Sequence, residues 1–129
     1  MTLGKAADSL VLSGPQSEGI VYVAEAPPVG EPVELLPGLW WLRLALPMRL
    51  DHVNVWLARD EDGWTIIDTG FDTPETRATW ERVLAAVLVG APVRRLLATH
   101  YHPDHIGLAG WLAQRTGAEL WTTRAEWLL

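Results

Sequence analysis

Three of the four histidines in this 129-residue chain fall within six residues, and an aspartate stands between the last two. The cluster is His100, His102, Asp104 and His105. Imidazole nitrogens and carboxylate oxygens are the usual ligands of a catalytic zinc ion, whose site keeps one position open. Residues at i and i+2 of an extended segment point the same way, so His100 and His102 are expected to approach one metal ion together. Asp104 and His105 follow Pro103, where the chain turns, and are expected to face a second point nearby.

The segment from His100 to His105 resembles the HxHxDH signature of the metallo-β-lactamase fold superfamily. That superfamily includes β-lactamases, glyoxalase II-type thioesterases, lactonases and nucleases. A second similarity lies upstream, where residues 68–70 resemble the Asp-Thr-Gly that ends a strand in the family. The resemblance covers roughly residues 33–129 and is to the N-terminal half of the family's domain. It departs from the common pattern at Leu108, where relatives often have a second glycine.

The resemblance implies an α/β (α+β) fold, namely the N-terminal portion of an αββα sandwich with a mixed sheet and flanking helices. It also implies a metal-dependent hydrolase that cleaves an ester, thioester or lactone through a metal-bound hydroxide, with two Zn²⁺ ions in the complete domain. It assigns His100 and His102 to one metal site and Asp104 and His105 to the other. Asp104 would also be catalytic, orienting the nucleophile as a ligand or as a base. The remaining ligands would follow Leu129.

Asp68 ends an apolar strand and has two interpretations. In the family this aspartate supports the metal-binding loop, and such supporting groups set the orientation of the ligands. Alternatively, its side chain forms an Asx-type turn with the two residues that follow. The sequence leaves both interpretations open.

The substrate-binding residues stay unassigned. Residues 45–54 resemble the loop that flanks the mouth of the site in relatives, with a solvated hairpin tip as the alternative. The candidates in or beside this segment are Met48, Arg49, His52 and Trp56. Tyr101 lies between two predicted ligands, and it either donates a hydrogen bond to a substrate oxygen or packs as a ring.

Two other functions compete with a zinc hydrolase. Relatives with the same motif are mononuclear-iron dioxygenases of persulfides, so iron is the alternative metal, and metal analysis separates the two enzymes. A third possibility is a non-catalytic half-domain that self-associates or binds a complementary chain through an exposed sheet edge. Light scattering discriminates that case.

The composition limits which classes of partner and which cellular compartment are expected for the chain. The net charge of −6 argues against a nucleic-acid partner held by phosphate contacts. The chain has no cysteine, which excludes disulfides and thiolate ligands. No stretch approaches the roughly 18 apolar residues of a membrane span, and the first residues are too polar for a signal peptide. A soluble, cytoplasmic protein acting on a small-molecule substrate is the expectation.

Hydrophobic periodicity and turn residues predict the order of elements. We expect an arm over residues 1–32, with a short edge strand at 20–24, and the domain over 33–129. Strands are predicted at 33–36, 39–46, 53–59, 64–68, 93–99 and 118–122. Helices are predicted from 73 to about 90 and from about 108 to 115, and a Thr-Arg-Ala-Glu capping box starts another at Thr123.

The first predicted helix carries an apolar stripe that should face a sheet. The stripe consists of Trp80, Val83, Leu84, Val87 and Leu88. The strand over residues 93–98 is expected to be buried on both faces. The helix covers one of these faces, and the missing partner sheet of a sandwich would cover the other.

Overall fold

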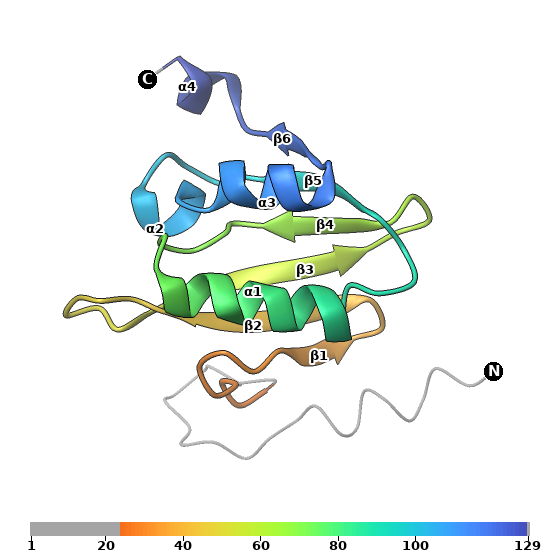
Figure 1. The fold of residues 1–129 in the computed structure, drawn as a ribbon, viewed down its shortest axis with the longest axis horizontal. Helices are drawn as coiled ribbons and strands as arrows, with labels where there is room; N and C mark the ends of the chain where they lie inside the picture. The colour runs from red at the N-terminus through yellow and green to blue at the C-terminus, as the bar shows by residue number, and fades with distance from the viewer. Residues whose placement is uncertain (1–23, 129) are drawn as a thin grey trace, which may run out of the picture.

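The computed structural model describes residues 24–128, which form a six-stranded sheet with helices (Figure 1). The strands lie in the sheet in chain order: β1 (Val33–Leu36), β2 (Leu39–Ala45), β3 (His52–Arg59), β4 (Trp64–Ile67), β5 (Val93–Leu97) and β6 (Glu119–Trp121). The helices are α1 (Pro74–Ala86), α2 (Pro103–Ile106), α3 (Ala109–Thr116) and α4 (Arg124–Trp127). Strands β1 to β4 pair antiparallel and β4 to β6 pair parallel, so the predicted mixed α/β sheet is confirmed.

The turn between β3 and β4 is shaped by Asp60 and Gly63. The backbone amides of Asp62 and Gly63 donate hydrogen bonds to Asp60 Oδ1 at 2.9 and 3.1 Å. These amide bonds lower the pKa of the Asp60 carboxyl below its ordinary value. Gly63 has a φ of 138°, and a Cβ there would lie 2.2 Å from the carbonyl oxygen of Pro92. Glycine is therefore required where this turn meets the chain entering β5.

Helix α1 begins as predicted and connects the parallel strands β4 and β5. Thr73 is its N-cap, and the backbone amide of Thr76 donates to the Thr73 hydroxyl at 3.1 Å. Pro74 occupies the first turn, where its missing N–H costs nothing. Trp80 and Val83 are buried against the sheet, so the apolar stripe docks where its periodicity indicated.

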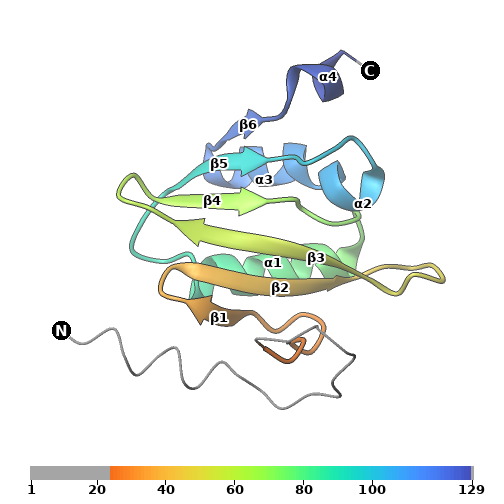
Figure 2. The same cartoon turned by 180° about the vertical axis from the view of Figure 1, so that it is seen from behind.

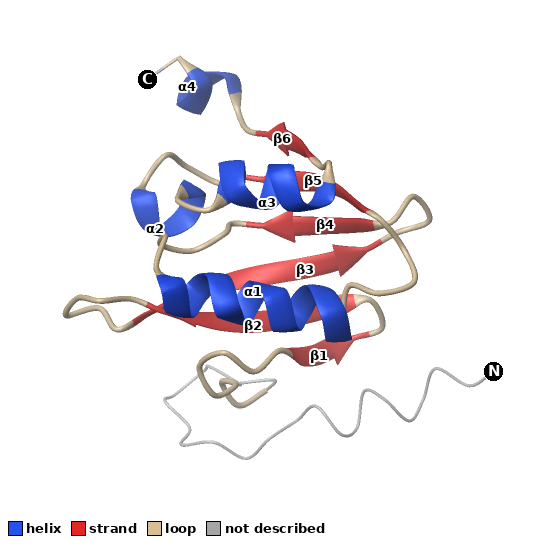
Figure 3. Ribbon diagram, in the orientation of Figure 1, coloured by secondary structure: helices blue, strands red, loops and turns tan. Residues whose placement is uncertain are grey.

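Both longer helices, α1 and α3, cover the same face of the sheet (Figure 3). The core lies between this face and the helices. Its fully buried members include Leu42, Val55, Ile66 and Leu96 from the sheet, with Trp80 and Leu112 from the helices. Alternate strand residues point to the core, as the side-chain period of two requires.

The opposite face carries no helix among the described residues, as the view from behind shows (Figure 2). One row of directly paired residues crosses five strands on this face: Trp41, Trp56, Ile67, Leu97 and Trp121. Trp41 and Trp56 stack with ring centroids 5.6 Å apart. We call these five residues the apolar row. Leu97 and Trp121 are 36% and 50% exposed, so the row is accessible to water at its β6 end.

Several sequence predictions need correction. Strand β5 is not buried on both faces, because Arg94 is exposed, Arg95 is half-buried and Leu97 faces the bare side. Helix α1 ends at Ala86, where the amides of Val87 and Leu88 both donate to Val83 O and break the helical spacing.

Two further differences concern local structure. The turn after His102 is a short helix, α2, which was not predicted; Pro103 at its first position favours that conformation. Leu88 lies beyond the end of α1 and is nevertheless buried in the core.

The predicted arm falls for the most part outside the described residues, as does the predicted edge strand at 20–24. In the described part, residues 24–32, the Gly30 amide donates to Arg43 O of β2 at 2.8 Å. Of the helices in residues 24–128, none has the length and apolar character needed to cross a membrane.

Candidate metal centre

The histidine cluster lies at the sheet edge where β4 and β5 both end (Figure 1). Because these strands are parallel, the segments that follow them emerge side by side. The ring of His100 lies with its centroid 4.7 Å from that of His102 and 4.0 Å from that of His105. Asp104 Oδ2 is 3.4 Å from His105 Nε2, longer than an ordinary hydrogen bond. The fold thus brings the four motif residues together.

Asp68 lies beneath this loop and is 5% exposed. Its carboxylate accepts three hydrogen bonds: from the Thr99 amide at 2.8 Å, from the Thr99 hydroxyl at 2.7 Å, and from His105 Nδ1 at 2.8 Å. A buried carboxylate needs such partners, because an unpaired one carries a large desolvation cost. These contacts favour the interpretation of Asp68 as a support of the loop over that of an Asx turn.

The hydrogen bonds around Asp68 fix which nitrogen of two rings carries a proton. His105 Nδ1 donates to the carboxylate, so its Nε2 is left with a lone pair when the ring is neutral. Thr99 has one hydroxyl proton and donates it to Asp68, so the 2.9 Å contact with His100 Nδ1 requires that nitrogen to donate. In the neutral ring of His100, Nε2 then also keeps its lone pair. Both rings therefore present the nitrogen that a metal ion binds.

Thr69 fastens the chain after the cluster. Its amide and its hydroxyl both donate to His105 O, at 2.7 and 2.9 Å, and its hydroxyl accepts from the Leu108 amide at 3.2 Å. The indole Nε1 of Trp80 in turn donates to Thr69 O at 2.8 Å. A core side chain of α1 is thereby linked through Thr69 to a histidine of the cluster.

Gly107 permits the close approach of α2 to the segment that follows β4. A Cβ at this position would lie 2.9 Å from Gly70 O and 2.3 Å from Pro103 O, both of them backbone atoms. On the same segment, Arg77 donates two hydrogen bonds to the Asp72 carboxylate, at 2.7 and 2.9 Å. These bonds lower the pKa of Asp72 below its ordinary value.

Three other sequence candidates, His52, Trp56 and Tyr101, have contacts that the structure describes. His52 is in β3, where it contacts Asp51 and Arg43. The bond from His52 lowers the pKa of the Asp51 carboxyl. Trp56 belongs to the apolar row. Tyr101 is 56% exposed, and its ring lies edge-to-face to that of His102 with centroids 5.0 Å apart.

The donors fit a zinc-type site in chemical kind but not in number. Imidazole and carboxylate suit Zn²⁺, and two of the rings have the required nitrogen free. Within residues 24–128, however, no three His, Cys, Asp or Glu side chains stand in an arrangement that could hold a metal ion. The described residues supply a partial set of donors.

Sequence reasoning missed three residues that build this region: Thr69, Thr99 and Trp80. Trp80 was interpreted as core packing alone, although a buried indole N–H usually needs a partner, which was the available signal. Thr69 stands within the Asp-Thr-Gly segment, but the contacts of Thr69 and Thr99 join segments more than 30 residues apart, and the sequence carries no local signal for those contacts.

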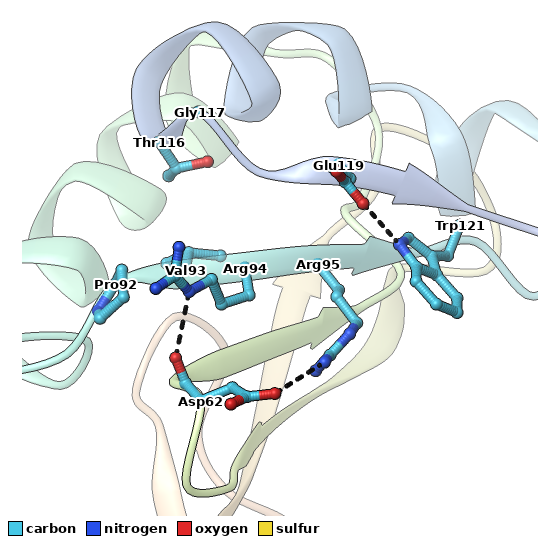
Figure 4. Close-up of a pocket in the computed structure, with 9 residues that line it drawn as sticks. All are labelled: Asp62, Pro92, Val93, Arg94, Arg95, Thr116, Gly117, Glu119 and Trp121. Atoms are coloured by element: carbon cyan, nitrogen blue, oxygen red, sulfur yellow. Dashed lines mark hydrogen bonds and ion pairs between the residues drawn. The ribbon is translucent and has the colours of Figure 1, made fainter.

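A pocket of about 460 Å³ lies elsewhere, between the start of β5, the end of α3, and β6 (Figure 4). Arg95 in this pocket pairs with Asp60 and Asp62 and lies over the Trp121 ring. Its charge is therefore balanced within the chain, and the pocket contains none of the motif residues.

The chain matches the family model of the metallo-beta-lactamase superfamily over residues 48–128. It is 39% identical over 70 residues to "Probable metallo-hydrolase YybB" of Bacillus subtilis (strain 168), a match over 54% of this chain and 29% of the relative. A beta-lactamase domain protein from Burkholderia ambifaria superposes with a TM-score of 0.75 at 43% identity, over 81% of this chain and 33% of that protein.

A metallo-beta-lactamase family protein from Thermus thermophilus superposes with a TM-score of 0.63 at 33% identity, over 73% of this chain and 31% of that protein. The chain thus spans about a third of the length of the proteins it resembles. The family match covers the HxHxDH segment, the Asp-Thr-Gly segment and the strands that carry them. On these grounds the chain belongs to the metallo-beta-lactamase superfamily.

Proposed function

We propose that this chain carries part of the catalytic centre of a zinc-dependent hydrolase that cleaves an ester, thioester or lactone. The observation that supports it is the pair of imidazoles, His100 and His105, whose Nδ1 atoms are both engaged through the Asp68 network. Second-sphere bonds of this kind hold metal-binding histidines in one tautomer in known zinc sites.

His100 and His102 would hold one ion, and Asp104 and His105 would hold a second. A zinc ion in such a site supplies Lewis acidity, which makes a water molecule acidic near neutral pH and polarises a carbonyl. The further ligands would come from polypeptide outside this sequence, as the span of about a third of the relatives' length suggests.

Asp104 is proposed to orient the attacking water. Its side chain is 21% exposed, as is that of His105, so both border the solvent from which water and substrate arrive. A carboxylate Oδ atom accepts a hydrogen bond from water and turns the oxygen lone pair toward the substrate. Asp68 is not assigned this role, because its carboxylate is buried and already accepts three hydrogen bonds from the chain.

The test is metal content and hydrolysis in the full-length protein. We expect zinc to co-purify and His100→Ala to lower its stoichiometry, with turnover tested on a thioester, a lactone, an aryl ester and a β-lactam. His52→Ala is the matched control, because His52 lies outside the cluster, and it should keep its zinc. Full zinc content in His100→Ala contradicts the proposed site. Iron in place of zinc, together with oxygen consumption on a persulfide, would replace the hydrolase by the dioxygenase alternative.

A further inference from the structure

The loop that carries His100 and His102 is tied to the C-terminal segment of the described chain. Strand β6 runs beside β5, and the Ala98 amide donates to Trp121 O at 2.8 Å. The Thr122 hydroxyl donates to Ala98 O at 3.2 Å. These two bonds hold the first residue of the loop, just before the motif begins.

Glu126 makes the next contact. Its carboxylate Oε2 accepts a hydrogen bond of 3.0 Å from the backbone amide of Tyr101, the residue between the two histidines. Glu126 is itself placed by the N-cap of α4, where its amide donates to the Thr123 hydroxyl at 3.3 Å. In a capping box the side chain of this glutamate would accept a hydrogen bond from the N-cap backbone amide. Here the carboxylate reaches across to the histidine loop.

This contact stands out when the anchors of the loop are compared. Thr99 is held by Asp68, and His105 by Asp68 and Thr69. For residues 100–104, the bond from Tyr101 to Glu126 is the one hydrogen bond to a distant part of residues 24–128. His102 and Pro103 are restrained locally by the bonds of α2, so Glu126 supplies the one distant anchor of this stretch.

The position of the anchored amide matters physically. The amide of Tyr101 belongs to the peptide unit that joins it to His100, so fixing that unit restrains how the Cα–Cβ directions of His100 and His102 stand to each other. A pair of ligands held in advance loses less conformational freedom when it closes on an ion. An ionised acceptor makes such a bond shorter and stronger than a neutral one does.

We infer that Glu126 is a positioning residue for the histidine pair: it fixes the Tyr101 peptide and thereby pre-orients His100 and His102 for the ion they share. The inference rests on the proposed function, because it concerns the affinity of the same site. It adds a carboxylate, about 25 residues along the chain, that touches neither metal nor substrate but sets how tightly the pair binds.

The experiment compares Glu126→Ala and Glu126→Gln with Glu119→Ala in the full-length protein. Glu119 is the matched control, because it is an exposed glutamate of the neighbouring β6 whose carboxylate, among residues 24–128, accepts a hydrogen bond from Trp121 Nε1 alone, at 3.4 Å. Zinc affinity is measured by chelator competition, and the cobalt-substituted absorption spectrum is recorded. Amide hydrogen exchange at Tyr101 is followed by NMR in the metal-free protein.

We expect Glu126→Ala to weaken zinc binding about 10- to 100-fold, the range found when groups that orient ligands are removed. Its cobalt spectrum should shift, and the Tyr101 amide should exchange faster. Glu126→Gln retains an acceptor oxygen and should recover most of the affinity and protection. Glu119→Ala should match the wild type in all three measurements.

Three results overturn the inference. They are an unchanged zinc affinity in Glu126→Ala, an equal loss in Glu126→Gln, and an equal loss in Glu119→Ala. If the proposed function is wrong, the wild-type protein itself binds no zinc, and this result distinguishes that failure from a failure of the Glu126 inference. In that event the exchange rate of the Tyr101 amide still decides whether Glu126 anchors the loop.

Discussion

Asp68 combines an unfavourable backbone conformation with the hydrogen bonds that hold the histidine loop. It is the one non-glycine residue with positive φ among residues 24–128, at 63°. Aspartate tolerates the left-handed region better than most residues, but the conformation still carries a cost. The turn points its carboxylate back under the loop, where Thr99 and His105 donate to it. Glycine would relieve the backbone and lose all three hydrogen bonds.

We predict that Asp68→Ala is destabilising and impairs the metal site. Removing the carboxylate leaves the Thr99 amide and hydroxyl and His105 Nδ1 without their partner, and a buried unsatisfied donor costs about 1–3 kcal/mol. Urea unfolding of the metal-free protein should show the loss, and chelator competition should show weaker zinc binding. Asp62→Ala, an exposed aspartate of the β3–β4 turn, is the control. Equal unfolding midpoints for the two variants would contradict this account.

Asp72 gives a prediction about acid stability. Its pKa is lowered from 3.8, chiefly by the hydrogen bonds from Arg77. A carboxyl whose pKa is lower in the folded than in the unfolded state stabilises the protein above the unfolded value, and this contribution is lost as pH falls through the folded value. Asp72→Asn should therefore flatten the dependence of unfolding free energy on pH below about 4. The pair is half-exposed, so the change should be small and should shrink in high salt.

At the level of elements, α1 both fills the core and supports the site. Trp80 is fully buried, yet its indole N–H donates to the carbonyl of Thr69, which holds His105. Packing and positioning are therefore combined in one side chain. A substitution that keeps the ring but removes the donor separates the two contributions.

Trp80→Phe should destabilise the fold and weaken the hydrogen bonds that join Thr69 to His105 and Leu108. The lost hydrogen bond leaves a buried carbonyl unpaired, at about 1–3 kcal/mol, and the smaller ring adds a cavity term. NMR should show faster exchange of the Thr69 and Leu108 amides. Val83→Ala opens a cavity beside the same helix but removes no hydrogen bond to Thr69. It should lower the free energy of unfolding without selectively speeding exchange of the Thr69 and Leu108 amides. Exchange that rises equally in both variants would show that Trp80 acts through packing alone.

The sequence was sufficient for the elements whose signals are local. Alternation predicted β3, turn residues bounded β2, and a nearly all-apolar run predicted β4. Thr73-Pro74 located the start of α1. The predictions for the end of α1 and for the burial of β5 were wrong, because both features depend on which surfaces the rest of the molecule covers. Arg94 and Arg95 already argued against a strand buried on both faces. Of the site, the spacing and the family motif indicated four residues that the structure places near one another, and their role as metal ligands stays a prediction. The contacts of Thr69, Thr99 and Glu126 cross between segments and had no local signal.

On the scale of the whole molecule, the bare face of the sheet determines whether the isolated chain associates in solution. The apolar row crosses five strands, and its β6 end is exposed. Contiguous apolar surface of this kind is uncommon on monomers and drives association. An αββα sandwich would cover it with a second sheet.

We predict that the 129-residue chain, produced alone, self-associates and hydrolyses little. Light scattering should give a mass above the 14.3 kDa of the monomer. Trp56→Lys should shift the population toward monomer, because a charge in the middle of the apolar row has no partner in the assembled state. Glu61→Lys, a charge change in the exposed β3–β4 turn outside the apolar row, is the control. A monodisperse monomer that binds two zinc ions tightly and turns over a thioester or lactone would contradict the prediction.

The bonds that hold the cluster join segments far apart along the chain: Asp68 to Thr99 spans 31 residues, Asp68 to His105 spans 37, and Thr69 to Leu108 spans 39. The antiparallel hairpins β1 to β4 close short loops, whereas the parallel pairing of β4 with β5 must first close the long one that contains α1. Loop closure of this length slows the search for native contacts. In a refolding experiment the hairpins should therefore gain protection first. Competence to bind metal should return last, so that zinc uptake reports the arrival of the native state.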